Sequence, residues 1–201
     1  MNAGSFSYFA IGDYDFDGKY GFSASIRRDA SYRFVDDNKW GTFWSVSGRW
    51  NIDKESFMKN VSFVDLLRLR GSYGTTGNNA IGLNEFQTLL GTSSYNNKGG
   101  MFPSQFGTTG LTWEIQNKFD AGVEFGLFNN RITGSVAYYN NDSNDLLLSL
   151  PMSLTTGHSS QTQNLGTLTN KGLEFELDLD LIRSDNFNWS VGGNFSTVNN
   201  E

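Results

Sequence analysis

The fold is decided by residues 118–140, KFDAGVEFGLFNNRITGSVAYYN. Apolar side chains alternate with Asp, Gly and Glu along 119–127, which predicts a β-strand with one apolar and one polar face. Asn129-Asn130 follows, and Asn tolerates the positive φ that a two-residue hairpin loop requires. We therefore expect a hairpin in which apolar side chains meet across the strands. The predicted pairs are Leu127 with Ile132, Phe125 with Gly134, Val123 with Val136, and Ala121 with Tyr138.

The composition agrees with a chain of many short strands. Of the 201 residues, 37% are hydrophobic and 15% are aromatic, and aromatic residues favour strands. The chain contains 23 Gly and only 2 Pro, as expected for strands joined by turns. Residues 54–60, KESFMKN, are the one stretch that suggests one or two turns of helix.

Charge and residue usage exclude several classes of protein. A net charge of −6 and a pI near 4.8 argue against nucleic-acid binding, which needs a basic surface. The absence of Cys excludes disulfide scaffolds and thiolate metal sites. No apolar run approaches the ~18 residues of a membrane helix. The first fifteen residues lack the regions of a signal peptide, so we expect either a cytoplasmic protein or part of a longer one.

The same alternation predicts eight strands in all. Residues 173–181 show it most regularly, with Leu and Phe against Glu174, Glu176, Asp178 and Asp180. The expected strands cover 6–16, 19–28, 42–52, 66–75, the two arms of the central hairpin (the second extending towards 148), 171–182 and 187–195.

The connections between these strands alternate between short and long. Asp17-Gly18, Asn129-Asn130 and residues 183–186 are tight turns, whereas 76–117 and 149–170 are long, irregular and polar. An up-and-down sheet puts alternate connections at opposite ends, and long loops at one end are typical of outer-membrane barrels. Long loops in compact domains are usually functional. A soluble β-sandwich, such as a carbohydrate-binding module, is the alternative that this pattern leaves open.

Strand length also suits a membrane. Residues 173–181 span roughly 26 Å at ~3.3 Å per residue. At a tilt of ~40° they cover about 20 Å of the membrane normal, near the ~25 Å apolar band of such barrels. Aromatic side chains would then lie at the headgroup level. The side chains we expect there are Trp44, Trp50, Tyr138 and Trp189.

Ordered segments across nearly the whole chain resemble one family, the SusC/RagA-like TonB-dependent transporters of the outer membrane. The segments are YDFDGKYGFSASIRRDASYRF (14–34), KWGTFWSVSGRWNI (39–52), ESFMK (55–59), LLRLRGSYGTTGNNAIG (66–82), LTWE (111–114), NKFDAGVEFGLFNNRITGSVAYYNNDSNDLL (117–147) and NLGTLTNKGLEFEL (164–177).

This resemblance implies a fold and a function. Members are barrels of about 22 strands, closed and plugged by an N-terminal domain. They import oligosaccharides or peptides with energy from the TonB complex, and a SusD-like surface lipoprotein covers their long loops. We therefore expect an all-β, antiparallel up-and-down meander of about eight strands, an arc of a large barrel in the Gram-negative outer membrane.

Residues 1–201 would then be a partial barrel that lacks the plug domain, the signal peptide and the final strands. A truncated gene product without independent activity is a further alternative. In either case the chain would perform no covalent chemistry.

The resemblance also directs attention to the two long loops, where substrate or lid contacts would fall. Aromatic side chains there are suited to stacking on sugar rings. The candidates are Tyr95, Phe102, Phe106 and Trp113.

No catalytic, cofactor-binding or metal-binding residue is assigned. Asp13-x-Asp15-x-Asp17-Gly18 resembles the start of a calcium loop, but Ala24 stands where a bidentate Glu is needed. The acidic row on 174–180 has a spacing of ~6.5–7 Å, near that of inverting glycosidases. A continuous row is more typical of a solvated strand face, here the wall of a lumen. Arg27, Arg28, Arg68 and Arg70 are expected to pair with such acids.

Overall fold

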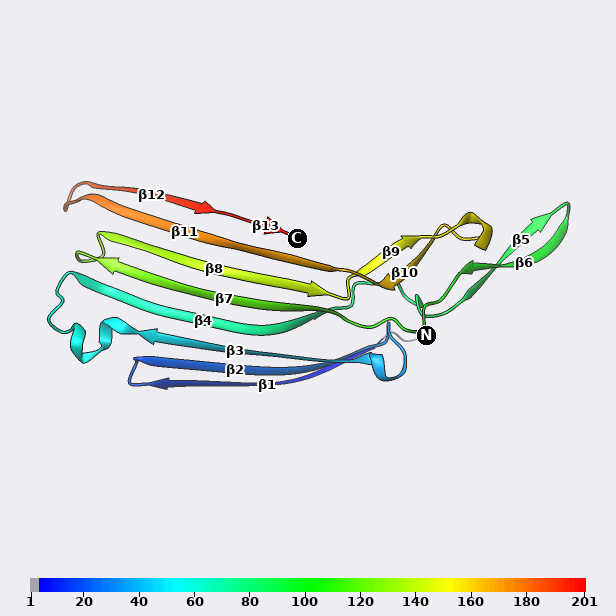
Figure 1. Cartoon of the computed structure of the whole chain (residues 1–201), viewed down its shortest axis with the longest axis horizontal. Helices are drawn as coiled ribbons and strands as arrows, with labels where there is room; N and C mark the ends of the chain where they lie inside the picture. The colour runs from blue at the N-terminus through cyan, green and yellow to red at the C-terminus, as the bar shows by residue number, and fades with distance from the viewer. Residues whose placement is uncertain (1–3) are drawn as a thin grey trace.

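A computed structural model describes residues 4–201, and eight long strands form its main sheet (Figure 1). All neighbouring strands are antiparallel, which confirms the predicted meander. A two-residue strand, β13 (Asn199–Asn200), continues beside β11. In spatial order the long strands are β1 (Ser5–Phe16), β2 (Tyr20–Ser31), β3 (Trp40–Asn51), β4 (Val64–Asn78), β7 (Glu114–Leu127), β8 (Ile132–Asn144), β11 (Thr167–Arg183) and β12 (Asn188–Ser196).

The central hairpin, β7–β8, has the predicted register, and all four expected pairs are present. Its turn is wider than expected. Phe128, Asn129 and Asn130 all have positive φ, at 56°, 60° and 55°. The amide of Asn130 donates a hydrogen bond of 2.9 Å to the carboxylate of Asp65, which fixes the turn against the start of β4.

The two long connections are not irregular, and this part of the prediction is wrong. The first contains the hairpin β5 (Leu89–Tyr95)–β6 (Lys98–Gln105), and the second contains β9 (Leu147–Pro151)–β10 (Ser160–Asn164). Residues 76–78 belong to β4, and β7 already begins at Glu114. The part of the chain that the structure describes therefore has thirteen strands, eight of them in the predicted meander.

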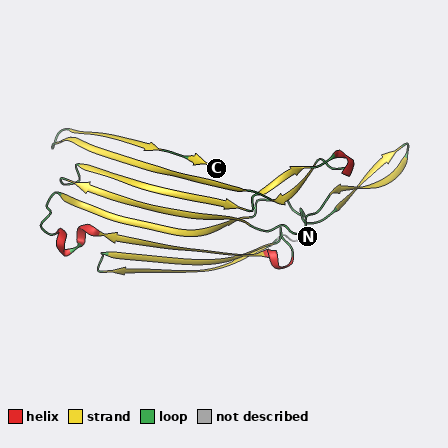
Figure 2. Cartoon of the chain, viewed as in Figure 1, coloured by secondary structure: helices red, strands yellow, loops and turns green. Residues whose placement is uncertain are grey.

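Helical structure is confined to short 3₁₀ turns (Figure 2). The helix expected over residues 54–60 is replaced by two such turns, η2 (Ile52–Lys54) and η3 (Ser56–Met58). The others are η1 (Asp36–Lys39) and η4 (Leu154–Thr156). Within residues 4–201 no helix has the length and apolar character needed to cross a membrane.

The predicted asymmetry of the connections is confirmed. Figure 1 shows the tight turns β1–β2, β7–β8 and β11–β12 together at one end, here called the short-turn end, with the η2–η3 connection. The connections over residues 32–39, 79–113 and 145–166 lie at the opposite end, here called the loop end.

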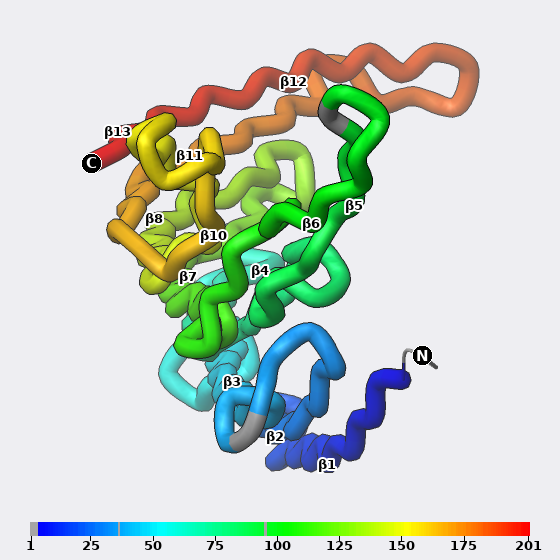
Figure 3. Tube along the Cα trace, turned by 90° about the vertical axis from the view of Figure 1, so that its right-hand side faces the viewer, coloured from blue at the N-terminus to red at the C-terminus, as the bar shows by residue number. Residues whose placement is uncertain are grey.

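The main sheet is a single layer whose strands follow an arc (Figure 3). One continuous row of apolar side chains crosses all eight strands on one face. It comprises Phe16, Tyr20, Trp50, Leu69, Val123, Val136, Phe175 and Phe195.

This apolar face remains uncovered. Leu69 is 43% exposed and Phe195 is 65% exposed. In a sandwich such a row would pack against a second sheet, but among the described residues no sheet lies over it. The β-sandwich alternative is therefore wrong.

The position of the apolar zone along the strands also changes from one strand to the next. On β3 the edge of the zone nearest the short-turn end is Trp50, on the row. On β12 this edge is Trp189, six residues nearer the short-turn end than Phe195, which is on the row. The zone thus shifts by six residues over the five steps from β3 to β12. With ~3.3 Å per residue and ~4.8 Å between strands this shift corresponds to a tilt of about 40°, within the ~35–45° of membrane barrels.

Candidate functional site

The polar face of the sheet carries a network of paired charges near the short-turn end. Arg49 and Arg70 are direct cross-strand neighbours, and two like charges in this position repel each other. Acidic side chains on β1, which lies one strand beyond β2, and on the adjoining β7 offset this repulsion. Asp15 on β1 lies 2.5 Å from the guanidinium of Arg49, and Glu124 on β7 lies 3.4 Å from that of Arg70.

Glu124 is the centre of the network, because it also accepts a hydrogen bond of 3.1 Å from Arg68, its cross-strand partner. Asp120 lies 4.0 Å from Arg70. These side chains line a hollow of about 530 Å³. They are about 28–51% exposed, so each pair contributes at most ~1 kcal/mol to stability. Their main effect is to present fixed charges of both signs to water.

The predicted pairing of arginines with acids holds for three of the four. Arg68 and Arg70 pair with Glu124, and Arg27 lies 2.8 Å from Asp29. For Arg28 the prediction is wrong. Its side chain is on the apolar face of β2, and its guanidinium carbon lies 5.1 Å from the ring centre of Trp40.

Farther along the sheet the polar face is acidic. Glu174, Glu176 and Asp178 on β11 are exposed and face the same side as Glu124. Within residues 4–201 no Lys or Arg lies within 4.0 Å of these three carboxylates, whereas Asp180 pairs with Arg183. Small side chains on the adjoining strands leave this acidic strip open to solvent. These neighbours are Ser135, Ala137, Gly192, Asn194 and Ser196.

An apolar patch on the polar face was missed by the sequence analysis. Phe9 and Ile11 of β1 are 69% and 63% exposed beside Ser25 and Arg27. They line a second hollow, of about 370 Å³. The signal for it is present in the sequence, since residues 8–11, YFAI, are apolar in both phases of the alternation.

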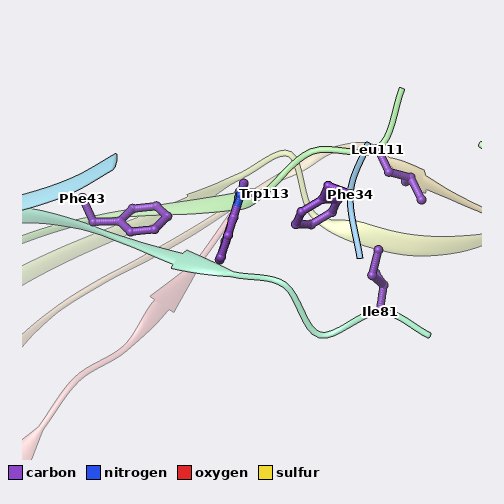
Figure 4. Packing of buried hydrophobic residues seen from close by; sticks show 5 residues of the cluster. All are labelled: Phe34, Phe43, Ile81, Leu111 and Trp113. Atoms are coloured by element: carbon purple, nitrogen blue, oxygen red, sulfur yellow. The ribbon is translucent and has the colours of Figure 1, made fainter. Parts of the chain in front are cut away.

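The one cluster of buried apolar side chains among the described residues lies at the base of the loops (Figure 4). Phe34 is fully buried, and its ring centre lies 5.4 Å from that of Trp113. The ring of Phe43, on β3, packs on the other side of the same indole, with the two ring centres 5.4 Å apart (Figure 4). Ile81 and Leu111 complete this loop-base core.

Hydrogen bonds add to the loop-base core. Arg33 donates to the carbonyl oxygens of Asn79, at 3.1 Å, and of Ile81. Asn38 donates to the carbonyl of Leu111 at 3.1 Å, and Trp113 donates to that of Lys39 at 3.3 Å. The connections over 32–39 and 79–113 are thereby joined into one structural unit.

The third long connection is joined to the second by Asn164. Its amide nitrogen donates to the carbonyl of Thr112 at 2.9 Å, and its oxygen accepts from the amide of Thr112 at 2.9 Å. Thr108 donates to the carbonyl of Thr162 at 2.8 Å. All three connections at the loop end therefore form one platform.

The four aromatic candidates in the loops have different surroundings. Phe102 on β6 is 46% exposed. The ring centre of Phe106 lies 4.2 Å from that of His158, so these two rings pack on each other. Trp113 is 6% exposed in the loop-base core, and both faces of its indole are covered. The side chain of Tyr95 lies outside the described residues.

At the short-turn end a carboxylate organises two aromatic side chains. Glu55, between η2 and η3, accepts hydrogen bonds from the hydroxyl of Tyr20 at 2.5 Å and from the indole of Trp50 at 3.1 Å. Lys19 lies 3.5 Å away. These contacts hold the pKa of Glu55 below its usual value. The largest effect comes from the hydrogen bond of Tyr20, followed by that of Trp50, and the charge of Lys19 has a smaller effect.

The acidic turn at Asp17-Gly18 uses its carboxylates within the fold. Asp15 accepts the amide of Gly18 at 2.8 Å as well as the guanidinium of Arg49. Asp17 and Gly18 have φ of 55° and 61°, as the predicted hairpin turn requires.

Comparison with known proteins finds similarity over nearly the full chain. The family model described as "TonB dependent receptor-like, beta-barrel" matches residues 2–201. "TonB-dependent receptor P39" of Formosa agariphila is 39% identical over 96% of this chain, and "TonB-dependent receptor SusC" of Bacteroides thetaiotaomicron is 36% identical over 97% of it.

A solved structure, "Structure of the RagAB peptide importer in the 'closed-closed' state", superposes on 99% of the chain with a TM-score of 0.92 and 33% identity. The chain spans 19% and 20% of the length of the two relatives and 22% of that solved chain.

Proposed function

Because the chain belongs to the family of TonB-dependent receptor-like β-barrels, we propose that it forms part of the wall and the outer loops of a transporter that imports oligosaccharides or peptides. It is an outer-membrane barrel segment of the Gram-negative type, similar to SusC. We assign it no covalent chemistry.

The two-faced single sheet is the observation that carries this proposal. Its uncovered apolar face, exposed at Leu69 and Phe195, suits lipid tails. Its opposite face carries the charged network around Glu124 over a hollow of about 530 Å³. The strand tilt of about 40° fits a large closed barrel, in which the polar face lines a wide, wet passage.

The chemistry of the polar face suits both cargo classes. Peptides carry charges of both signs, which complement the arginines and carboxylates of the network. Oligosaccharides offer hydroxyl groups that carboxylates and guanidinium groups bind by hydrogen bonds. The relative described as RagAB is a peptide importer. The cargo test below therefore includes one probe of each class.

The loop platform is the proposed site of capture. We propose that a SusD-like surface lipoprotein covers it and that the TonB complex supplies energy through parts of the transporter beyond this segment. Phe102, Phe106 and Tyr95 are the proposed aromatic contacts to cargo. Trp113 instead supports the platform from below, because its indole is buried.

Uptake by cells that carry the full-length transporter tests this function. Fluorescently labelled casein peptides and labelled malto-oligosaccharides are supplied to wild-type cells, to cells without the transporter and to cells without TonB. We expect one probe to accumulate only in the wild type. Equal accumulation in all three strains, or in none, would contradict the proposal.

A point variant then tests the loop contact. Phe102→Ala is expected to raise the probe concentration needed for half-maximal uptake. Met101→Ala is the matched control, since Met101 is the adjacent side chain on β6 and is 71% exposed. An equal effect of both variants would remove Phe102 from the proposed contacts.

A further inference from the structure

Four side chains form a cluster on the apolar face at the loop end of β1, β2 and β3. The rings of Phe6, Tyr8 and Trp40 lie 6.0–6.4 Å apart, centre to centre. The guanidinium of Arg28 lies over the Trp40 ring at 5.1 Å. Arg28 is exposed and belongs to the same face as the apolar row through Tyr20.

A second aromatic group on the same strands fixes the level of this cluster. Phe16, Tyr20 and Trp50 are stacked at the short-turn end, with ring centres 6.3–6.5 Å apart. Trp40 and Trp50 are ten residues apart on one face of β3, roughly 33 Å along the strand. At the tilt of about 40° this separation is about 25 Å across the membrane, the height of the apolar band of a barrel. The Arg28 cluster therefore lies where lipid tails give way to headgroups.

The charge of Arg28 has no partner among the described residues. No described carboxylate lies within 4.0 Å of its guanidinium. The adjacent Arg27 points to the opposite face and pairs with Asp29 at 2.8 Å. A cation that faces lipid is costly unless it reaches an anion or the interface.

We propose that Arg28 binds the phosphate group of a lipid in the membrane leaflet at the loop end. This inference rests on the membrane placement proposed above. The planar guanidinium can donate two parallel hydrogen bonds to phosphate oxygens, and stacking on Trp40 holds it at the headgroup level. The acyl chains lie along the apolar face below, over Ile26 and Trp44, which are 52% and 41% exposed. Trp44 therefore lies below the headgroup level that was expected for it, and Trp40 takes that level instead. An anionic lipid thus complements both the charge and the apolar surface.

Native mass spectrometry of the full-length transporter tests this lipid site. The probes are monophosphoryl lipid A and the same glycolipid without its phosphate. Arg28→Gln is expected to weaken binding of the phosphorylated probe about fivefold, as for one basic residue near a membrane surface, and to leave the phosphate-free probe unchanged. Arg28→Lys should retain part of the preference. Arg27→Gln is the matched control and should bind both probes as the wild type does.

Three results would overturn the proposal. They are an unchanged preference in Arg28→Gln, an equal loss in Arg27→Gln, or full displacement of the lipid by inorganic phosphate, which would identify a site for the free ion. The heat-dependent gel shift of the folded barrel is measured on the same preparations and should be normal for every variant. If the membrane placement itself is wrong, the wild type binds neither glycolipid, which distinguishes that failure from loss of the phosphate preference alone.

Discussion

Removal of Phe34 from the loop-base core should open the platform without unfolding the barrel. Phe34 is fully buried and packs against Trp113, and the surrounding Phe43, Ile81 and Leu111 are 8% exposed or less. Truncation of a buried Phe to Ala typically costs ~3–5 kcal/mol, from lost transfer free energy and from the cavity left behind. The cost falls on local opening, because four of the five core residues, namely Phe34, Ile81, Leu111 and Trp113, lie outside the strands of the main sheet.

Surface proteolysis measures this opening. Since about 1.4 kcal/mol corresponds to a tenfold change, Phe34→Ala should increase the open population about a hundredfold or more. When closing is faster than cleavage, the rate of digestion follows the open population. Proteinase K added to intact cells should therefore cut within residues 79–113 at a correspondingly higher rate.

Leu83→Ala is the matched control, because Leu83 lies in the connection that is cut, residues 79–113, and is 55% exposed. Its cleavage rate should stay within about twofold of the wild type, as surface substitutions usually change stability little. The heat-dependent gel shift should be normal for both variants. A Phe34→Ala rate equal to that of Leu83→Ala would refute the role of the loop-base core.

Three further predictions follow from other contacts. The usual pKa of a Glu carboxyl is 4.5, and folding lowers that of Glu55. Glu55 therefore stabilises the folded state at pH values above 4.5, and this contribution is lost as the pH falls through the lowered pKa. The wild-type fluorescence of Trp50 should change below pH 4.5, whereas Glu55→Gln should lack this transition, and identical profiles would contradict the assignment. Glu124→Gln should lower the free energy of unfolding of the barrel in urea more than Asp120→Asn does, because Glu124 pairs with two arginines and Asp120 with one at 4.0 Å. Each pair lost should cost up to ~1 kcal/mol. Equal effects would argue against a central role for Glu124. Gly77→Ala should impair folding, because the added methyl group would clash with the buried ring of Phe43. Gly48→Ala should be tolerated, since a Cβ there has nothing within 4 Å. The folded fraction on a semi-native gel measures both variants, and equal folded fractions would count against the clash.

The sequence predicts the main sheet well because its two faces are so different. The register of the central hairpin follows from the period of two, since a slip by one residue would move Phe125 and Val123 to the polar face. The same reasoning places Glu174 and Glu176 opposite to Phe175. Family resemblance and alternation agree on these strands.

The hairpins in the long connections were missed because the alternation there is weak. Asn96-Asn97 is the same dipeptide as Asn129-Asn130 and also has positive φ, at 50° and 57°. The sequence does not mark it as a turn, because its flanks, LLGTSSY and KGGMFPSQ, do not separate into apolar and polar phases. Backbone pairing between polar strands leaves little trace in side-chain pattern.

Some side chains lie elsewhere than predicted, because the prediction relied on residue type more than on position in the alternating pattern. Arg28 is two residues after Ile26, so the alternation itself assigns it to the apolar face, against the expectation that arginines line the lumen. Trp113 looks available for stacking on cargo, because nothing local indicates that Phe34 and Phe43, distant in sequence, enclose its ring. Such contacts depend on tertiary structure and are not encoded in a local pattern.

The sidedness of the wall can be measured directly on β11. Residues 1–201 contain no Cys, so a single introduced Cys is the only labelling site within them. A spin label is placed in turn at each position from Leu173 to Asp180 in the full-length transporter, after any Cys outside this segment has been replaced. Odd positions should be reached by oxygen from the lipid, and even positions by a water-soluble nickel complex, in a regular period of two. Equal access of the nickel complex to both sets, or protection of the odd set from both reagents, would contradict a wall between lipid and a wet passage.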